Sequence, residues 1–279
     1  MNKQGTPYSL GIIDYRNIVS TLKDFYMLDF SNYSFTAFKR QLEKVIGMHN
    51  MSNANDLVAK IRDEEKFVAT FLHEISIEET EMFRDPGLWR ELREIILPKI
   101  ITGGECKIWV PDITSGEELF TLLIVLDEMK ALDKVSVIAT SICDLNIEAV
   151  KKGVYNMKKM EVNIANYKRY KGKYQFTKYY TVKNNDAYMD LSLLNKVEFK
   201  TLQIPDNKDI NNVKLILYRD KMLYFNKRME SDYLQILYNS LHQAGYFIIG
   251  IKESLECCNA EKRFTLINST ESIYKKTFL

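Results

Sequence analysis

Residues 107–121 constrain the fold of this 279-residue chain more than any other stretch. An aromatic and β-branched run at 108–110 predicts a strand, and a turn that contains Gly116 follows it directly. Leucines then recur at helical spacing, and Glu117 and Glu118 fall in the first helical turn, where negative charge suits the helix dipole. A strand, a turn and a helix in this order favour an α/β sheet, in which small ligands bind at the carboxyl ends of the strands. An ordinary βα unit without a ligand has the same pattern.

Predicted strands and helices alternate after this stretch. The strands are short apolar runs, which are typical of a parallel sheet that helices cover on both faces. This alternation favours a doubly wound α/β domain. We predict strands at 135–140, 213–217, 245–251 and 264–268, and helices at 146–152 and 232–241.

The first 86 residues have a different pattern. Apolar residues recur at helical spacing, and no proline interrupts the chain between residues 7 and 86, which favours a small helical bundle. We therefore predict a helical domain at 1–86 and an α/β domain at 87–279.

A segment rich in tyrosine and lysine, residues 157–200, interrupts the alternation of strands and helices. Its short alternating runs, such as residues 179–183, predict a small antiparallel insertion beside the main sheet. Three interpretations of this insertion stay open. It is a half-exposed sheet whose tyrosines cover its apolar side, a strand edge that recognises a peptide, or a surface that stacks on RNA and neutralises it.

The charge balance and the cysteines argue against several classes of protein. The formal net charge is +2, from 39 basic and 37 acidic residues, which argues against wholesale nucleic-acid binding. The four cysteines have no CxxC spacing, so a zinc site is not expected. The first ten residues lack the apolar core of a signal peptide, and no apolar run approaches membrane-spanning length. We therefore expect a cytoplasmic protein without a membrane span.

Arg84 stands between Phe83 and Asp85, directly before a Pro-Gly break. One interpretation is a helix end with a local ion pair. The other is an arginine held at a domain junction, where it faces the site after the first strand. Arginine suits that role because its guanidinium holds a carboxylate in a bidentate geometry.

Five stretches, taken in order, resemble one known family. They are TEMFRDP at 80–86, IWVPDITSGEELFT at 108–121, IATSICDLNIEAVKKGVY at 138–155, LILYRDKMLYFNK at 215–227 and GYFIIGIKESL at 245–255. The chain resembles the CheR family, chemotaxis-receptor methyltransferases that transfer a methyl group from S-adenosylmethionine to protein glutamate. The resemblance implies an N-terminal helical domain and a Rossmann-like S-adenosylmethionine-dependent methyltransferase domain. It also implies a small antiparallel β insertion, which in some members grips a receptor peptide.

The resemblance further implies which residues act on the ligands. Arg84 and Tyr224 are the implied catalytic residues, since Arg84 would orient a carboxylate and Tyr224 would border the methyl-transfer position. The residues implied to bind the donor are Glu78, Thr80, Arg84, Gly116, Glu117, Glu118, Ser141, Cys143, Gln203, Ile204, Arg219 and Asp220.

Several of these positions depart from the family's pattern. A glycine position holds Asp112, and the two aspartates expected after the second strand are Ser141 and Cys143, with Asp144 one position too late. A lost charge-assisted hydrogen bond costs roughly 1.5–3 kcal/mol. We therefore expect weak donor affinity, which Ser141→Asp or Cys143→Asp would tighten unless a local bulge brings Asp144 to the ribose.

Three functions are compatible with the sequence. An active methyltransferase would act by in-line displacement on a glutamate carboxylate that is already ionised at neutral pH, so catalysis would be mostly positioning. Its partners would be acidic side chains of a receptor or signalling protein. The alternatives are a catalytically degenerate relative that keeps the fold as an interaction module, and an RNA-binding protein.

Overall fold

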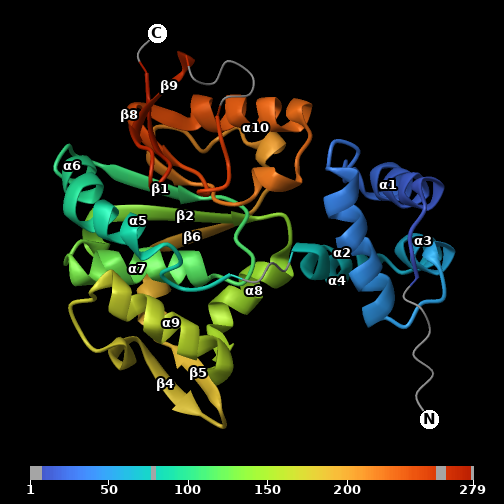
Figure 1. The fold of residues 1–279 in the computed structure, drawn as a ribbon, viewed down its shortest axis with the longest axis horizontal. Helices are drawn as coiled ribbons and strands as arrows, with labels where there is room; N and C mark the ends of the chain where they lie inside the picture. Colours follow the sequence, from blue (N-terminus) through green and yellow to red (C-terminus); the bar gives the residue numbers. More distant parts are fainter. Residues whose placement is uncertain (1–7, 77–79, 256–261, 278–279) are drawn as a thin grey trace. The chain divides into compact units, whose positions relative to one another are not determined.

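The computed structural model describes residues 8–76, 80–255 and 262–277, and Figure 1 labels their helices and strands. Contacts within the chain divide it into two compact units. The helical unit comprises Met1–Ile77 with Met222–Ser231, and the α/β unit comprises Glu78–Lys221 with Asp232–Leu279. The domain boundary that the sequence places at residue 86 stays a prediction.

The helical unit contains the four helices α1 (Ile12–Tyr26), α2 (Phe35–Met48), α3 (Ala54–Asp63) and α4 (Glu65–Ser76), together with the short turn η6 (Met222–Tyr224). Each helix buries an apolar stripe, as the spacing predicts. Asn53 caps α3, because its side chain accepts the backbone N–H groups of Asn55 and Asp56. The predicted N-terminal helical region is therefore confirmed.

The α/β unit is built on a seven-stranded sheet in the order β6-β2-β1-β7-β8-β10-β9. The strands β6, β2, β1, β7 and β8 run parallel, and β10 lies antiparallel between β8 and β9. Ile108 pairs with Val137 on one side and Leu215 on the other. The strand bounds are β1 Cys106–Val110, β2 Val135–Ser141, β6 Val197–Thr201, β7 Val213–Leu217, β8 Leu241–Ile248, β9 Phe264–Asn268 and β10 Ile273–Lys276.

Helices cover both faces of this sheet. The connections from β1 to β2 and from β2 to β6 run in one direction along the sheet, and the connection from β7 to β8 runs in the other. Right-handed crossovers therefore place α7 (Glu117–Glu128) and α8 (Asp144–Lys152) on one face and α10 (Lys227–Ser240) on the other, as Figure 1 shows. The predicted doubly wound, Rossmann-like fold is confirmed. The segment before β1 is helical as α5 (Pro86–Glu91), the π-helical segment η1 (Leu92–Ile96) and α6 (Leu97–Ile101).

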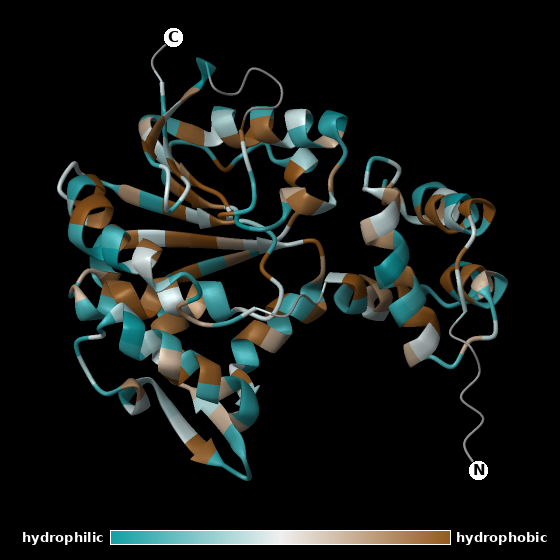
Figure 2. Cartoon of the chain, viewed as in Figure 1, coloured by the Kyte–Doolittle hydropathy of each residue, from teal (hydrophilic) through white to brown (hydrophobic). Residues whose placement is uncertain are grey.

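Hydropathy agrees with this layering. Figure 2 shows hydrophobic colours along the central strands of the sheet and hydrophilic colours on the helix faces that point away from it. The helix α7 is buried on nearly all sides, because the sheet covers one side and the segment 155–193 packs against the other. Its two ends are consequently both interior positions of the unit.

A second, small antiparallel sheet has the order β3-β5-β4. Its strands are β3 (Val154–Asn156), β4 (Tyr180–Lys183) and β5 (Asp186–Met189), which confirms the predicted insertion. Short 3-10 turns stand at η2 (Leu132–Lys134), η3 (Phe176–Tyr179), η4 (Leu191–Lys196) and η5 (Ile204–Asp206).

The extent predicted for this insertion was wrong at both of its ends. Residues 157–170 form the helix α9 (Met157–Tyr170), and β6 joins the main sheet beside β2. Tyr167 and Tyr170 lie in the segment predicted to be an antiparallel insertion, but their separation of three places both on the buried face of a helix. The strand β10 was not predicted, because its sequence IYKK has only one fully apolar residue.

Candidate functional site

The turn after β1 requires a glycine at one position. Gly116 has φ 89 and begins α7, and a Cβ atom there would lie 2.8 Å from Cγ2 of Val150 and 3.2 Å from the hydroxyl of Tyr155. The Tyr155 hydroxyl donates a hydrogen bond to the Ser115 carbonyl at 2.7 Å. The sequence identified Gly116, but the packing of Val150 and Tyr155 against it appears only in the structure. The backbone of this turn is therefore held tightly beside the carboxyl end of β1.

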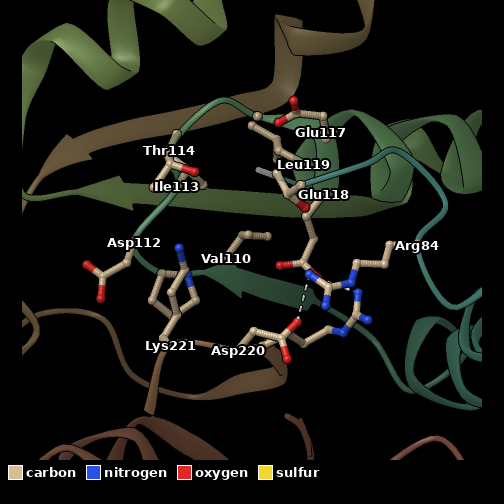
Figure 3. Close-up of a pocket in the computed structure, with 14 residues that line it drawn as sticks. Arg84, Val110, Asp112, Ile113, Thr114, Glu117, Glu118, Leu119, Asp220 and Lys221 are labelled. Carbon is tan, nitrogen blue, oxygen red and sulfur yellow. Dashed lines mark hydrogen bonds and ion pairs between the residues drawn. The ribbon is translucent and has the colours of Figure 1, made fainter. Parts of the chain in front are cut away.

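A pocket opens at this turn and is drawn in Figure 3. Its walls come from the segment before α5, the turn after β1, the start of α7 and the segment after β7. The lining residues are Thr80, Arg84, Val110, Pro111, Asp112, Ile113, Thr114, Gly116, Glu117, Glu118, Leu119, Arg219, Asp220 and Lys221.

Glu117 is buried in this pocket wall. The Ser115 hydroxyl donates a hydrogen bond to its Oε2, whereas its Oε1 has no hydrogen-bond partner among the described residues. Burial raises the pKa of Glu117 above the ordinary carboxyl value. A buried carboxylate oxygen without a partner costs free energy, which a positively charged donor group bound in the pocket would recover.

Arg219 connects three walls of the pocket through two ion pairs. Its Nη1 donates to Oε1 of Glu118 at 2.9 Å, and its Nη2 donates to Oδ2 of Asp85. Burial lowers the pKa of Arg219, but the carboxylates of Glu118 and Asp85 more than offset this and hold the pKa above its ordinary value. The guanidinium therefore fixes the first turn of α7 against the end of β7 and the start of α5.

Arg84 lies in the same pocket and contacts Asp220. Its Nη1 is 3.2 Å from Oδ2 of Asp220, and its side chain is 36% exposed. The backbone beside it is well held, since Phe83 donates its N–H to Oγ1 of Thr121 at 2.9 Å and Trp89 donates its Nε1–H to the Arg84 carbonyl at 2.9 Å. Arg84 is thus presented to the pocket by a rigid segment.

Further charged residues, which are not among those implied to bind the donor, contribute to the pocket. Lys221 lines it, and Asp112, with φ 50, accepts a hydrogen bond from the Tyr218 hydroxyl at 3.2 Å. Asp85 contributes through Arg219. Asp85 and Lys221 are adjacent in the sequence to Arg84 and Asp220, and this adjacency is the sequence signal that points to them.

Four predicted donor-binding residues lie outside the pocket lining. Ser141 is buried at the end of β2, where its Oγ accepts hydrogen bonds from Nδ2 of Asn146 at 3.0 Å and from the N–H of Cys143 at 3.4 Å. Cys143 precedes α8, and burial raises the pKa of its thiol. Gln203 and Ile204 follow β6. They lie near Ser141, because the N–H of the preceding residue, Leu202, donates a hydrogen bond to the Ser141 carbonyl at 2.8 Å.

No bulge interrupts the pairing of β2 before Asp144. The pairing of β2 with β6 runs from Val137 to Ser141 without a shift of register. Asp144 is exposed at the start of α8, and its carboxylate accepts a hydrogen bond from the Thr201 hydroxyl.

Two further predicted residues do not belong to the described pocket. Glu78 lies outside the described residues. Tyr224 belongs to the helical unit, where its carbonyl accepts the Ser34 N–H at 2.7 Å. The structure therefore brings together Thr80, Arg84, Gly116, Glu117, Glu118, Arg219 and Asp220. In the described ranges, no group of three or more histidine, cysteine or acidic side chains is arranged to hold a metal ion.

Comparisons with known proteins agree on one family. The family model "CheR methyltransferase, SAM binding domain" matches residues 78–273. Cher3 of Pseudomonas putida is 27% identical over 265 residues, which cover 95% of this chain and 97% of that protein. Chemotaxis protein methyltransferase 1 of Pseudomonas aeruginosa is 22% identical, with 81% of this chain and 84% of that protein covered. The chemotaxis protein methyltransferase of Borreliella burgdorferi is 26% identical, with 77% of each chain covered.

Proposed function

This chain belongs to the CheR methyltransferase family and carries its S-adenosylmethionine-binding domain, and we propose that it methylates glutamate carboxylates of a chemoreceptor or another signalling protein. Several relatives in sequence are named chemotaxis protein methyltransferases, which supports a receptor as the acceptor. S-adenosylmethionine is the methyl donor, and the reaction is a methyl transfer of the CheR type.

The observation that carries this proposal is the unpartnered Oε1 of the buried Glu117 in the pocket wall. Glu117 fits the donor's amino group, because an ammonium would supply the missing hydrogen bond to that oxygen. Arg84 fits a carboxylate, because only its Nη1 contacts Asp220. At Gly116 the absence of a Cβ lets the turn pack closely against Val150 and Tyr155, which holds the backbone of the pocket wall in place. The residues present therefore fit the amino-acid portion of the donor.

The main contribution of the protein to this reaction is to position the donor and the acceptor carboxylate. The donor supplies an electrophilic methyl group on a positively charged sulfur. A glutamate oxygen of the acceptor forms the new C–O bond with the methyl carbon while the C–S bond breaks, and the electron pair of that bond stays on sulfur. The acceptor carboxylate is already ionised near neutral pH, so no general base is needed. Arg84 and the ion pairs around Arg219 keep the pocket rigid, which is where the rate gain arises.

We propose that the ribose side of the site contributes little to donor affinity. Ser141 already accepts two hydrogen bonds, so it offers the donor only its own hydroxyl hydrogen. We keep the prediction that donor affinity is weak and that Ser141→Asp or Cys143→Asp tightens it.

A peptide partner fits the small sheet. Among the described strands, β4 pairs with β5 on one side only, which leaves an edge to which an extended peptide can add as a further strand. We propose this edge as the docking site of the acceptor protein. No described helix has the length and apolarity of a membrane span, and we propose that the protein acts in the cytoplasm. Nucleic acid is not part of the proposal, given the near balance of charge.

A labelling experiment tests the acceptor. The full chain would be incubated with S-adenosylmethionine labelled at the methyl group and with cytoplasmic fragments of candidate receptors, with and without glutamate-to-alanine changes at their labelled positions. We expect label on the receptor that base releases as methanol, as a carboxyl ester requires. Arg84→Ala should remove the labelling, whereas Glu198→Ala on the exposed edge of β6 should leave it unchanged. Binding of the donor with no labelled protein acceptor would contradict the proposal and favour an interaction module.

A further inference from the structure

Glu253 joins the two strand ends that flank one side of the pocket. It lies after β8, and its Oε2 accepts the backbone N–H of Asp220 at 2.8 Å and the backbone N–H of Gly250 at 2.6 Å. The strands β7 and β8 are parallel neighbours, with Leu217 paired to Ile248. One carboxylate oxygen therefore ties the chain that leaves β7 to the chain that leaves β8 at the ligand-binding edge of the sheet.

Asp220 is held in a conformation that needs such support. It has φ 60, a left-handed conformation that a residue with a side chain adopts only at a cost in conformational energy. Its carboxylate lies directly over Gly250, since a Cβ atom on that glycine would be 2.1 Å from Oδ1 of Asp220. Glu253 therefore holds the Asp220 backbone, and Gly250, which has no side chain, leaves room for the Asp220 carboxylate.

The Asp220 carboxylate in turn forms an ion pair with Arg84. Oδ2 of Asp220 is 3.2 Å from Nη1 of Arg84, and the Asp220 side chain is 14% exposed. Figure 3 shows the Arg84 guanidinium and the Asp220 carboxylate next to each other in the pocket. A guanidinium has five N–H donors, so one contact to Asp220 fixes its direction while other donors remain for a ligand.

We propose that Glu253 is a positioning residue of the methyl-transfer pocket, which acts through Asp220 to aim Arg84 at the carboxylate of the bound donor. The role of Arg84 in this inference rests on the proposed function. Glu253 itself is not among the residues that line the pocket, and it acts by fixing the backbone of a residue that does. The inference concerns donor binding and is independent of which protein accepts the methyl group.

The test measures the affinity of the full chain for S-adenosylhomocysteine, the demethylated product, by titration calorimetry, with circular dichroism as the check of folding. Glu253→Ala should weaken binding by about tenfold, because it releases two hydrogen bonds to a charged acceptor. Glu253→Gln keeps an acceptor oxygen and should stay within about threefold of wild type. Glu198→Ala is the matched control, since it removes an exposed carboxylate remote from these bonds, and it should not change the affinity.

Two further measurements separate positioning from a general loss of structure. The double variant Arg84→Ala/Glu253→Ala should bind no more weakly than Arg84→Ala alone, because Glu253 acts through Arg84. In the ligand-free protein, the amide hydrogens of Asp220 and Gly250 should exchange faster in Glu253→Ala than in wild type, and other amides of β7 and β8 should not. If Glu253→Ala fails to fold, Asp220→Ala tests the same link, since it removes the carboxylate that holds Arg84, and we expect the same loss of affinity.

Specific results would overturn the inference. These are a folded Glu253→Ala protein that binds the product like wild type, losses that multiply in the double variant, and a wild type that binds no product. A failure to find the acceptor would leave these binding results unaffected, so the two proposals can fail separately.

Discussion

The two ends of helix α7 each bury a glutamate, and the surroundings of the two carboxylates differ. At the C-terminal end, Glu128 accepts hydrogen bonds from the hydroxyls of Tyr167 at 2.5 Å and Tyr170 at 2.9 Å, and from the N–H of Lys173 at 2.9 Å. At the N-terminal end, Glu117 accepts one side-chain hydrogen bond, from Ser115, and its Oε1 is left without a described partner.

The difference separates a structural carboxylate from one prepared for a ligand. Glu128 receives donors from the segment 167–173 and so fastens α9 and the small insertion to α7. Burial, together with the hydrogen bond to Glu128, raises the pKa of Tyr167 far above its ordinary value, so the phenol remains a donor. Glu117 faces the pocket with an oxygen that protein groups do not satisfy. Burial alone does not distinguish the two residues, but hydrogen-bond satisfaction does.

The largest expected effect is a loss of stability at the C-terminal end of α7, where Glu128 accepts three hydrogen bonds. Glu128→Ala leaves the Tyr170 hydroxyl and the Lys173 N–H without their acceptor, so we expect the free energy of unfolding to fall by about 3 kcal/mol. Urea unfolding would measure this, with Glu161→Ala on the exposed side of α9 as the control. A change below about 1 kcal/mol would show that the cluster around Glu128 is not what fastens the insertion.

The turn that begins α7 should be the next most sensitive position. Gly116→Ala places a methyl group 2.8 Å from Val150 in a left-handed backbone conformation, so we expect a loss of about 2 kcal/mol in unfolding free energy. Product affinity should fall as well, because the pocket wall shifts. Gly47→Ala is the matched control, since a Cβ there meets nothing within 4 Å. Equal stability of the two variants would contradict the packing described for this turn.

At the N-terminal end of α7, we expect a substitution of Glu117 to affect ligand binding more than stability. Glu117→Gln removes a buried charge, so the unfolding free energy should change by less than about 1 kcal/mol and in the stabilising direction. Affinity for S-adenosylhomocysteine should nevertheless drop about tenfold, because a charge-assisted hydrogen bond to the ligand's amino group is lost. Calorimetric titration and urea unfolding of the same preparations measure both quantities. A variant that is destabilised but binds normally would remove the distinction between the two ends of α7.

The smallest expected effect is a pH dependence that comes from Glu117. Burial raises its pKa in the folded state above the ordinary value of 4.5, so the folded protein holds this proton more tightly than the unfolded chain does. The resulting stability is fully present below pH 4.5 and is lost as the pH rises through the raised pKa.

Glu117→Gln has no such proton. The unfolding free energy of wild type should therefore fall relative to that of the variant as the pH rises above 4.5, and the difference should level off once the folded carboxyl is ionised. Urea unfolding of both proteins at a series of pH values measures this difference. Parallel pH profiles would show that Glu117 has the same pKa in both states.

The sequence by itself determined the local elements and the place of the site along the chain. Strands β7 and β9 lie where their apolar runs predict them, and α8 ends at Lys152, directly before Gly153, which has φ 60. The turn that contains Gly116, directly before Glu117 and Glu118, predicted where the pocket lies along the chain. These features follow from spacing and from backbone preference over a few residues, and a single sequence contains that information.

Only the tertiary structure decided how the charges are partnered. Arg219 meets Glu118 and Asp85 from positions 101 and 134 residues away, and Glu253 reaches the Asp220 amide across 33 residues. Glu117 and Glu128 look equivalent in sequence, since each is a glutamate at one end of the same helix. Their difference arises from which distant donors the fold brings to each carboxylate. Local periodicity does not specify such contacts, because they depend on how the strands and helices pack against one another.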